Sequence, residues 1–257
     1  MSQPPPDFGR TAEDYARHRA GFPPQLLERL SQQGIVRPGD RVADLGTGTG
    51  SLARLFAQHG CEVTGVDVAP QLLAQARRLD EQAGVTICYL EAPAERTGLP
   101  AAAFELVSAG QCWHWFDRPA AAAEVERLLV AGGAVVIAHF DWLPIAGNVV
   151  AVTEELILRF TPGWPFAERA GLYPPWLTDL QTAGFEQIES FSFDVVVPYS
   201  HDAWAGRVRA SAPIAGTLDA DGVRRFSEQL SEILGQRFAE QPLLTPHRVW
   251  AVAARKP

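Results

Sequence analysis

A glycine-rich segment with an acidic residue in front of it is the most informative feature of this 257-residue chain. Its residues are, in order, Asp44, Leu45, Gly46, Thr47, Gly48, Thr49 and Gly50. Glycines permit a tight turn and let a ligand approach the backbone closely. Because a strand-like apolar run precedes the segment and a helix-like pattern follows it, we expect a loop that binds a nucleotide-like ligand. The dinucleotide fingerprint G-x-G-x-x-G is not met, since the third glycine comes one residue early and Ser51 stands at the last position.

A second candidate is Asp67, which ends the apolar segment 62–67. A carboxylate at the C-terminal end of the second strand can accept hydrogen bonds from both hydroxyls of a ribose. We therefore expect Asp67 and its neighbour Val68 to contact a nucleoside. The alternative is that Asp67 only caps a helix, because Pro70 is typical of a helix start.

Two further segments follow predicted strands. Ala94 and Glu95 come after the third strand, and 110–116 follows the fourth. In open α/β sheets, ligands bind outside the carboxyl ends of the strands. All four segments are therefore expected to meet at one crevice.

The elements that position these segments alternate between strand and helix. Strands are predicted at 41–45, 62–68, 85–90, 104–109 and 133–139, with helical patterns between them. This alternation favours βαβ units with right-handed crossovers and a parallel sheet. Later strands at 185–195 and 247–254 complete the prediction. It is an α/β fold: a Rossmann-like, seven-stranded, mostly parallel sheet with helices on both faces and helical cap inserts.

We expect one domain over residues 1–257. Its parts are N-terminal lid helices at 1–30, a cofactor-binding core at 35–140 and cap inserts at 141–173 and 198–245. The inserts are expected to cover the ligand-binding edge of the sheet.

Composition excludes several classes of function. The net charge of −8 argues against a nucleic-acid binder, which would carry a basic surface. No run of about 18 apolar residues occurs, so no membrane span is expected. The spacing of His and Cys offers no metal site. The N-terminus lacks the pattern of a signal peptide, and the three cysteines form no CxxC pair. We therefore expect a cytoplasmic protein.

In combination, these motifs resemble the class I S-adenosylmethionine-dependent methyltransferases. The closer resemblance is to the small-molecule type 11 group, which includes ubiquinone/menaquinone-biosynthesis and trans-aconitate methyltransferases, and it covers about residues 10–140. It implies that the glycine segment contacts the methionine part of the cofactor and that Asp67 holds the ribose. Ala94 and Glu95 would flank the adenine, and Gly110, Gln111 and 114–116 would border cofactor and substrate.

The chain departs from the family pattern in places. Glu91 stands where relatives commonly have Gly, and Ala92 where many have Asp. The segment 126–133 has Val-Ala in place of the family's Lys-Pro. The N-terminal segment with Tyr15 and Arg19 resembles a lid helix whose hydroxyl or guanidinium would meet the cofactor carboxylate. A plain surface helix is the alternative.

Methyl transfer from a sulfonium needs position and exclusion of water rather than a protein nucleophile. A base helps only when the acceptor arrives protonated. His114 and His139, at the ends of predicted strands, are the candidates, with His201 as a third. A hydrogen-bonded pocket wall is the alternative for each.

Aromatic side chains are candidates for the substrate pocket, with core packing as the alternative. They are Trp113, Trp115, Phe116, Trp142 and Trp204, together with His114. An aromatic face near a sulfonium attracts the cation. Arg207 and Arg209 could meet an anionic substrate, although exposed arginines are the default.

The leading hypothesis is a methyltransferase that uses S-adenosylmethionine, releases S-adenosylhomocysteine and acts on a small molecule, with oxygen slightly favoured as acceptor. One alternative is a cofactor-binding protein that transfers no methyl group. The other is an NAD(P)-dependent oxidoreductase, against which the misplaced third glycine and Asp44 argue. No nucleic-acid or membrane partner is expected.

Overall fold

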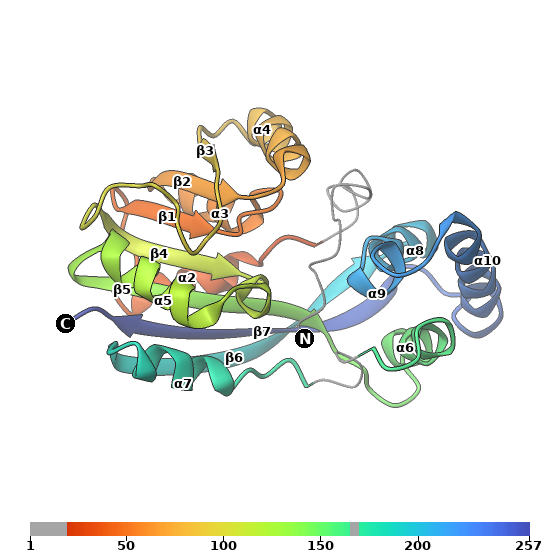
Figure 1. The fold of residues 1–257 in the computed structure, drawn as a ribbon. Coiled ribbons are helices and arrows are strands. Elements are labelled where there is room, and N and C mark those ends of the chain that lie inside the picture. Colours follow the sequence, from red (N-terminus) through yellow and green to blue (C-terminus); the bar gives the residue numbers. More distant parts are fainter. Residues whose placement is uncertain (1–19, 165–169) are drawn as a thin grey trace. The chain divides into compact units, whose positions relative to one another are not determined.

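The computed structural model describes residues 20–164 and 170–257 (Figure 1). The chain forms two compact units, each treated by itself below. The sheet unit comprises Gly21–Phe140, Tyr173–Phe193 and Val249–Pro257. The helical unit comprises the described residues of Asp141–Leu172 and Asp194–Arg248, with Ala20. The predicted inserts fall largely in the helical unit, whereas the single-domain division stays a prediction.

The strands form one seven-stranded sheet in the order β3-β2-β1-β4-β5-β7-β6. Their bounds are β1 Arg41–Leu45, β2 Glu62–Asp67, β3 Cys88–Glu91, β4 Phe104–Gly110, β5 Leu129–Trp142, β6 Glu186–Tyr199 and β7 Leu243–Arg255. Pairing from β3 through β5 is parallel, whereas the arrow of β7 runs against that of β4 (Figure 1). This confirms the predicted mostly parallel, seven-stranded sheet. Because β1 pairs with both β2 and β4, the chain order reverses beside β1, where such sheets bind ligands.

The helices of the sheet unit precede the first strand or lie in the connections between strands. They are α2 Pro24–Gln32, α3 Ser51–Gln58, α4 Pro70–Ala83, α5 Arg118–Leu128 and α7 Pro175–Thr182, with a short 3-10 helix, η2, at Trp113–Trp115. The right-handed rule places α3 and α4 on one face of the sheet and α5 on the other. In agreement, α3 contacts α2 and α4, whereas α5 contacts α7. Local signals set the ends: Asp117 caps α5 by accepting from the Ala120 amide, and Gly84 ends α4 in the left-handed region.

The start of β5 differs from the expectation. We predicted that this strand begins at 133, but α5 ends at Leu128 and β5 begins at Leu129. The ladder between β4 and β5 contains an irregularity, since Phe104 pairs with Leu129 and Leu106 with Ala134. The extra residues bulge out of the ladder, which sequence periodicity does not reveal. The last two strands are also longer than predicted because both continue beyond the sheet unit.

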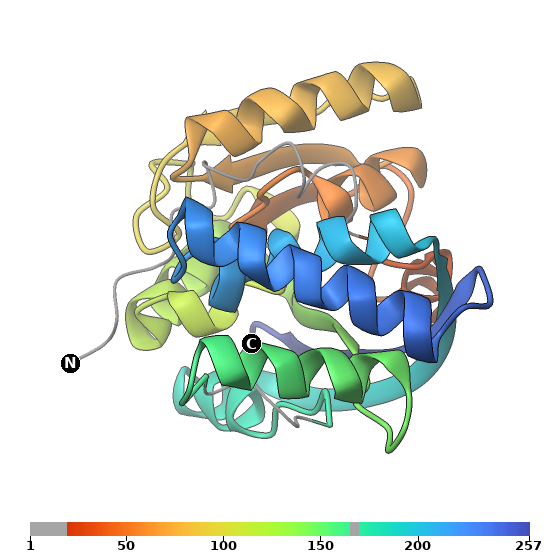
Figure 2. The same cartoon turned by 90° about the vertical axis from the view of Figure 1, so that its right-hand side faces the viewer.

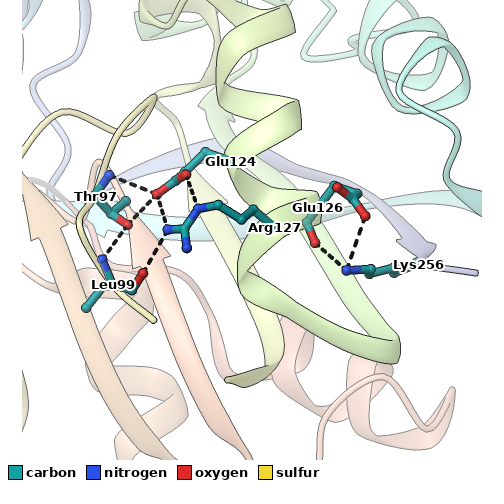
Figure 3. Close-up of polar contacts among 6 residues, drawn as sticks. All are labelled: Thr97, Leu99, Glu124, Glu126, Arg127 and Lys256. Atoms are coloured by element: carbon teal, nitrogen blue, oxygen red, sulfur yellow. Dashed lines mark hydrogen bonds and ion pairs between the residues drawn. The ribbon is translucent and has the colours of Figure 1, made fainter. Parts of the chain in front are cut away.

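The core of the sheet unit is built from apolar side chains of the central strands with those of α5 and α7. Leu45, Val107, Ile137, Leu128 and Leu180 are fully buried in it. A polar cluster joins the loop after β3 to α5 (Figure 3). The Glu124 carboxylate accepts from the Thr97 amide and hydroxyl, and Arg127 donates to Glu124 and to the Leu99 carbonyl. The segment after β3 is thereby held against the helix.

The helical unit contains α6 Val149–Phe160, α8 His201–Arg209, α9 Ala212–Ala215 and α10 Ala220–Arg237. The long helix α10 is drawn in blue and α6 in green in Figure 2. Helix α10 contacts α6 and α8. The core of the helical unit contains Trp204, Phe226 and Leu156, all fully buried. In the part of the chain that the structure describes, no helix is long and apolar enough to cross a membrane.

Candidate cofactor and active site

The glycine loop, residues 46–50, joins β1 to α3 as predicted. Gly46, Gly48 and Gly50 have φ angles of 61°, 56° and 75°, a backbone conformation that favours glycine. Among the described residues, no atom lies within 4 Å of the position that a Cβ would take at Gly48. The described part of the chain therefore leaves the loop backbone open to a ligand at its centre.

Asp67 links this loop to the next helix. Its Oδ2 accepts from the Gly48 amide at 2.8 Å, and its Oδ1 accepts from the Ala69 amide at 2.9 Å. Burial raises the pKa of Asp67, and the backbone hydrogen bonds oppose that shift. Ala69 is the N-cap residue of α4, so the helix-start alternative contributes to the geometry without excluding ribose binding. Each carboxylate oxygen keeps a second lone pair for a ligand hydroxyl.

Asp44 is a buried carboxylate at the end of β1, only 1% exposed. It lies opposite Ser108 in the β1–β4 ladder, and its Oδ1 accepts from the Ser108 hydroxyl at 2.6 Å. Burial raises the pKa of Asp44 to about 6, although the Ser108 hydrogen bond opposes that shift. A cationic ligand group would favour the charged form. Sequence analysis missed Ser108, because cross-strand neighbours are set by sheet order.

The segment after β4 turns sharply at Gln111, whose φ is 58° although it is not glycine. Such strained positions cluster at functional sites. Gln111 is held on both sides: its amide donates to Ala138 O at 2.8 Å and its Nε2 donates to Phe140 O. At Gly110, a Cβ would come within 2.9 Å of the Phe22 ring. Phe22 is a second residue that sequence analysis missed.

The predicted adenine-flanking residues follow β3. Ala94 is buried, and Glu95 Oε1 accepts from the Asp117 amide at 2.9 Å, which joins the loops after β3 and β4. Val68, after β2, is 63% exposed, so its apolar side chain is available to a flat apolar group.

The structure corrects the predicted role of Trp113. Its side chain is fully buried in the core of the sheet unit, and its Nε1 donates to Asp179 Oδ2 at 3.0 Å. Arg118 donates to both oxygens of the same carboxylate. A fully buried indole with a satisfied N–H is a packing residue, so Trp113 is not a wall of an open pocket.

His114, Trp115 and Phe116 lie partly exposed at the end of η2. The His114 ring lies 4.5 Å from that of Trp115, between centroids. At Gly46, a Cβ would come within 2.9 Å of the Phe116 ring, so Phe116 borders the glycine loop. These three predicted residues therefore remain candidates for the substrate side of the site.

The structure also corrects His139, predicted as a candidate base. It is 1% exposed, and its Nε2 accepts a hydrogen bond from Trp176 Nε1 at 3.0 Å. The ring stacks on Tyr173 at a centroid distance of 3.6 Å. A base needs a free lone pair, and this contact uses the one on Nε2 and places the proton on Nδ1. His139 is therefore packed in a buried cluster with Tyr173 and Trp176.

Two predicted pocket tryptophans lie in the helical unit and belong to its core. Trp142 Nε1 donates to Glu154 at 2.8 Å, and Trp204 Nε1 donates to Thr153 at 3.0 Å. Both are buried, so the core-packing alternative is correct for them. Arg207, expected to be exposed, is instead buried, and its guanidinium lies 4.6 Å from the Trp142 ring centroid.

His201 begins α8, and its Nε2 lies 2.8 Å from Phe238 O, a hydrogen bond within the helical unit. Tyr15 and Arg19 lie outside the described residues. Within the described ranges, no group of three or more His, Cys, Asp or Glu could hold a metal ion.

The donor set of the sheet unit fits an adenosyl cofactor. The open backbone at Gly48 gives close approach, Asp67 gives acceptors for a ribose and buried Asp44 gives a carboxylate for an ammonium group. Exposed Val68 offers apolar contact at the same edge of the sheet. These residues would hold, in that order, the backbone-contacting, ribose, amino-acid and base portions of such a molecule.

Comparison with known proteins also indicates a methyltransferase. Residues 43–137 match the family model described as a methyltransferase domain. An uncharacterized methyltransferase of Mycobacterium tuberculosis is 29% identical over 177 residues, 66% of each chain. The demethylmenaquinone methyltransferase of Thermus thermophilus is 38% identical over 48% of this chain and 58% of its own length. The malonyl-[acyl-carrier protein] O-methyltransferase of Enterobacter lignolyticus is 36% identical over 49% of each. The matches thus span about half to two thirds of these relatives.

Among solved structures, phosphoethanolamine N-methyltransferase 2 of Haemonchus contortus, in complex with phosphomonomethylethanolamine and S-adenosylhomocysteine, has a TM-score of 0.57. It is 20% identical, and the alignment covers 97% of this chain and 57% of that one. At this identity the likeness concerns the fold. Residues 43–137 are thus similar to a methyltransferase domain of the type 11 group, and the relatives and the fold agree with that similarity.

Proposed function

We propose that this protein transfers the methyl group of S-adenosylmethionine to a small-molecule acceptor, with oxygen favoured as the accepting atom. The observation that carries the proposal is the hydrogen bond from the Gly48 amide to Asp67. It joins the open glycine loop to the predicted ribose carboxylate at the ligand-binding edge of the sheet.

The cofactor supplies an electrophilic methyl group, and the chain supplies position and exclusion of water. The glycine loop with Thr47 and Thr49, Asp44, Asp67 and Val68 would bind it. Ala94, Glu95, Gly110 and Gln111 would complete its surroundings, together with Tyr15 and Arg19 from the N-terminal segment. No protein nucleophile takes part.

On the acceptor side, Trp115 and Phe116 offer aromatic surface, and His114 is the group that can take a proton from a hydroxyl acceptor. Oxygen is favoured because this segment carries aromatic groups rather than carboxylates that would hold an amine. The O-methyltransferase among the relatives supports the same preference. We place the reaction in the cytoplasm, because Cys61, Cys88 and Cys112 are all free thiols, as expected in a reducing compartment.

The first test is thermal unfolding with S-adenosylmethionine, S-adenosylhomocysteine, NAD and NADP, each near 100 times its dissociation constant. Binding to the native state should add about 2.7 kcal/mol, a shift on the order of 5–10 °C for a chain of this size. A shift with the two adenosyl compounds alone supports the proposal. A shift with a nicotinamide cofactor instead would overturn it.

The acceptor is then sought with S-adenosylmethionine carrying a labelled methyl group and a panel of phenols, carboxylic acids and amines. Label on oxygen acceptors supports the finer proposal, and label on amines alone contradicts the preference for oxygen. Tight binding with no transfer to any acceptor would favour a cofactor-binding protein without methyl transfer. The Asp67→Ala variant is the control for transfer that does not depend on the site.

A further inference from the structure

A largely buried arginine contacts the glycine loop. Arg54, on the second turn of α3, is 16% exposed at its side chain. Its Nη2 donates to the Thr49 carbonyl at 2.9 Å and to the Ala76 carbonyl of α4 at 3.3 Å. The guanidinium therefore joins the loop to two helices.

Asp80 holds this guanidinium in place. Arg54 Nε donates to Asp80 Oδ1 at 3.0 Å, and Nη2 lies 2.9 Å from the same oxygen. Asp80 is only 4% exposed. A buried ion pair is weak evidence for stability, because desolvation offsets most of its Coulomb energy. A fixed geometry is the better account of such a pair beside a ligand loop.

Tyr89, on β3, closes the space beside the pair. A Cβ at Gly50 would collide with the Tyr89 hydroxyl, and one at Gly65 would come within 2.6 Å of its ring. Burial raises the pKa of Tyr89, and Asp80 raises it further. The uncharged phenol therefore packs closely against Gly50 and leaves this residue little room to move.

The Gly48 amide of the loop is held by the Asp67 carboxylate, and two other amides are held by the sheet and by the loop itself. The Thr47 amide donates to Val66 O at 3.0 Å, and the Gly50 amide donates to Thr47 O at 2.9 Å. The Thr49 carbonyl instead depends on the Arg54 side chain. The peptide between Thr49 and Gly50, at the start of α3, is therefore the part of the loop that the Arg54 side chain holds.

We propose that Arg54, held by Asp80 and packed beside Tyr89, is a positioning residue that sets the Thr49–Gly50 peptide of the cofactor loop. This inference rests on the proposed function, because the ligand of the loop is the adenosyl cofactor. A loop that is already ordered loses less conformational entropy when its ligand binds. Loss of the Arg54 contacts should therefore weaken cofactor binding more than it slows the transfer step.

The chain offers a matched control in Arg127 and Glu124 (Figure 3). Arg127 Nε donates to Glu124 at 2.7 Å, and its Nη2 donates to the Leu99 carbonyl at 2.8 Å. This pair has the same arrangement of arginine, carboxylate and backbone carbonyl as Arg54, Asp80 and Thr49. It lies on α5 and holds the loop after β3 instead of the glycine loop.

The experiment compares Asp80→Asn and Arg54→Lys with Glu124→Gln. Calorimetry gives the dissociation constant of S-adenosylhomocysteine, and steady-state kinetics on an active acceptor give kcat and the KM for S-adenosylmethionine. We expect the first two variants to raise the dissociation constant and that KM about tenfold, equal to about 1.4 kcal/mol, with kcat within twofold of the parent. Glu124→Gln should lower the melting temperature and leave both cofactor constants unchanged, because the contacts of this pair reach Thr97 and Leu99 and not the proposed cofactor residues Ala94 and Glu95.

Amide hydrogen exchange adds a readout that needs no acceptor. Exchange at the Gly50 amide should become faster in Asp80→Asn and stay unchanged in Glu124→Gln. If Asp80→Asn does not fold, Arg54→Lys and Tyr89→Phe carry the same test. Parent-like cofactor binding in variants that lose only stability would overturn the inference. Failure of the parent protein to bind either adenosyl compound would instead remove the proposed function and, with it, this inference.

Discussion

Asp67 accepts a hydrogen bond from the Gly48 amide with one carboxylate oxygen and a hydrogen bond from the Ala69 amide with the other. The side chain predicted to bind the ribose therefore also joins the glycine loop to the start of α4. One substitution at this position should consequently affect both ligand binding and stability, and the two effects can be separated.

Asp67→Ala should raise the dissociation constant for S-adenosylmethionine at least tenfold, about 1.4 kcal/mol, because two ribose hydroxyls lose a charged acceptor. It should also lower the melting temperature, since two backbone amides lose their acceptor. Calorimetry and thermal unfolding measure the two effects. Asp219→Ala is the control: it removes an N-cap that accepts from the Gly222 amide of α10, and it should lower stability by about 1 kcal/mol with no change in affinity. Unchanged affinity in Asp67→Ala would show that Asp67 only organises the helix start.

Asp44 should make stability depend on pH in a defined direction. Its folded pKa of about 6 lies above the unfolded value, so the native state binds more protons between about pH 4 and pH 6. The contribution of Asp44 to stability is thus present below the unfolded pKa and is lost as pH rises through 6. Asp44→Asn should unfold at a higher temperature than the parent at pH 7.5, and the difference should shrink towards pH 4.5. The same variant should bind S-adenosylmethionine more weakly.

The comparison of variant with parent at each pH cancels other titrating groups, such as His247, whose pKa burial lowers to about 4. A difference in melting temperature that stays constant from pH 4.5 to pH 7.5 would contradict the raised pKa of Asp44.

The Trp176→Phe variant distinguishes the structural role of His139 from the proposed proton-accepting role of His114. It removes the N–H that His139 Nε2 accepts and leaves a buried acceptor unpaired, which costs about 1–3 kcal/mol. We expect lower stability, with kcat per folded molecule near that of the parent. His114→Asn should instead lower kcat for a hydroxyl acceptor and shift its pH profile. A loss of kcat confined to His139→Asn, with His114→Asn fully active, would reverse these assignments.

Glu124 should stabilise the protein against acid. Hydrogen bonds from Arg127 are the main reason that its pKa falls to about 2. A depressed carboxyl pKa stabilises the fold above the unfolded value, near 4.5, and that contribution is lost as pH falls towards 2. Denaturant unfolding from pH 6 to pH 2.5 should show a smaller loss of stability in Glu124→Gln than in the parent. Equal slopes for the two proteins would show that the ion pair (Figure 3) does not contribute.

Much of the fold was predictable because its signals are local. The glycine loop, Pro70 at the start of α4 and the apolar runs of the central strands each act within a few residues. The start of β5 was misjudged because its bulge depends on the neighbouring strand β4. The lengths of β6 and β7 were misjudged for a related reason, since both strands continue into the helical unit.

The site was predictable to a different degree on its two sides. The predicted cofactor side consists of motifs that are contiguous in the sequence. In the structure, Gly48 of the glycine loop donates a hydrogen bond to Asp67. The aromatic residues gave no such guidance. A tryptophan in the sequence looks the same whether it lines a pocket or fills a core, and Trp113 and Trp204 prove to be fully buried.

By itself, the sequence determined the fold class and the position of the glycine loop between a strand and a helix, because each depends on short-range spacing. Only the tertiary structure decided which side chains face each other across elements. It placed Ser108 beside Asp44, Trp176 on His139 and Arg54 between the loop and Asp80. Those contacts depend on sheet order and helix packing, which join residues that lie from 26 to 64 positions apart in the chain.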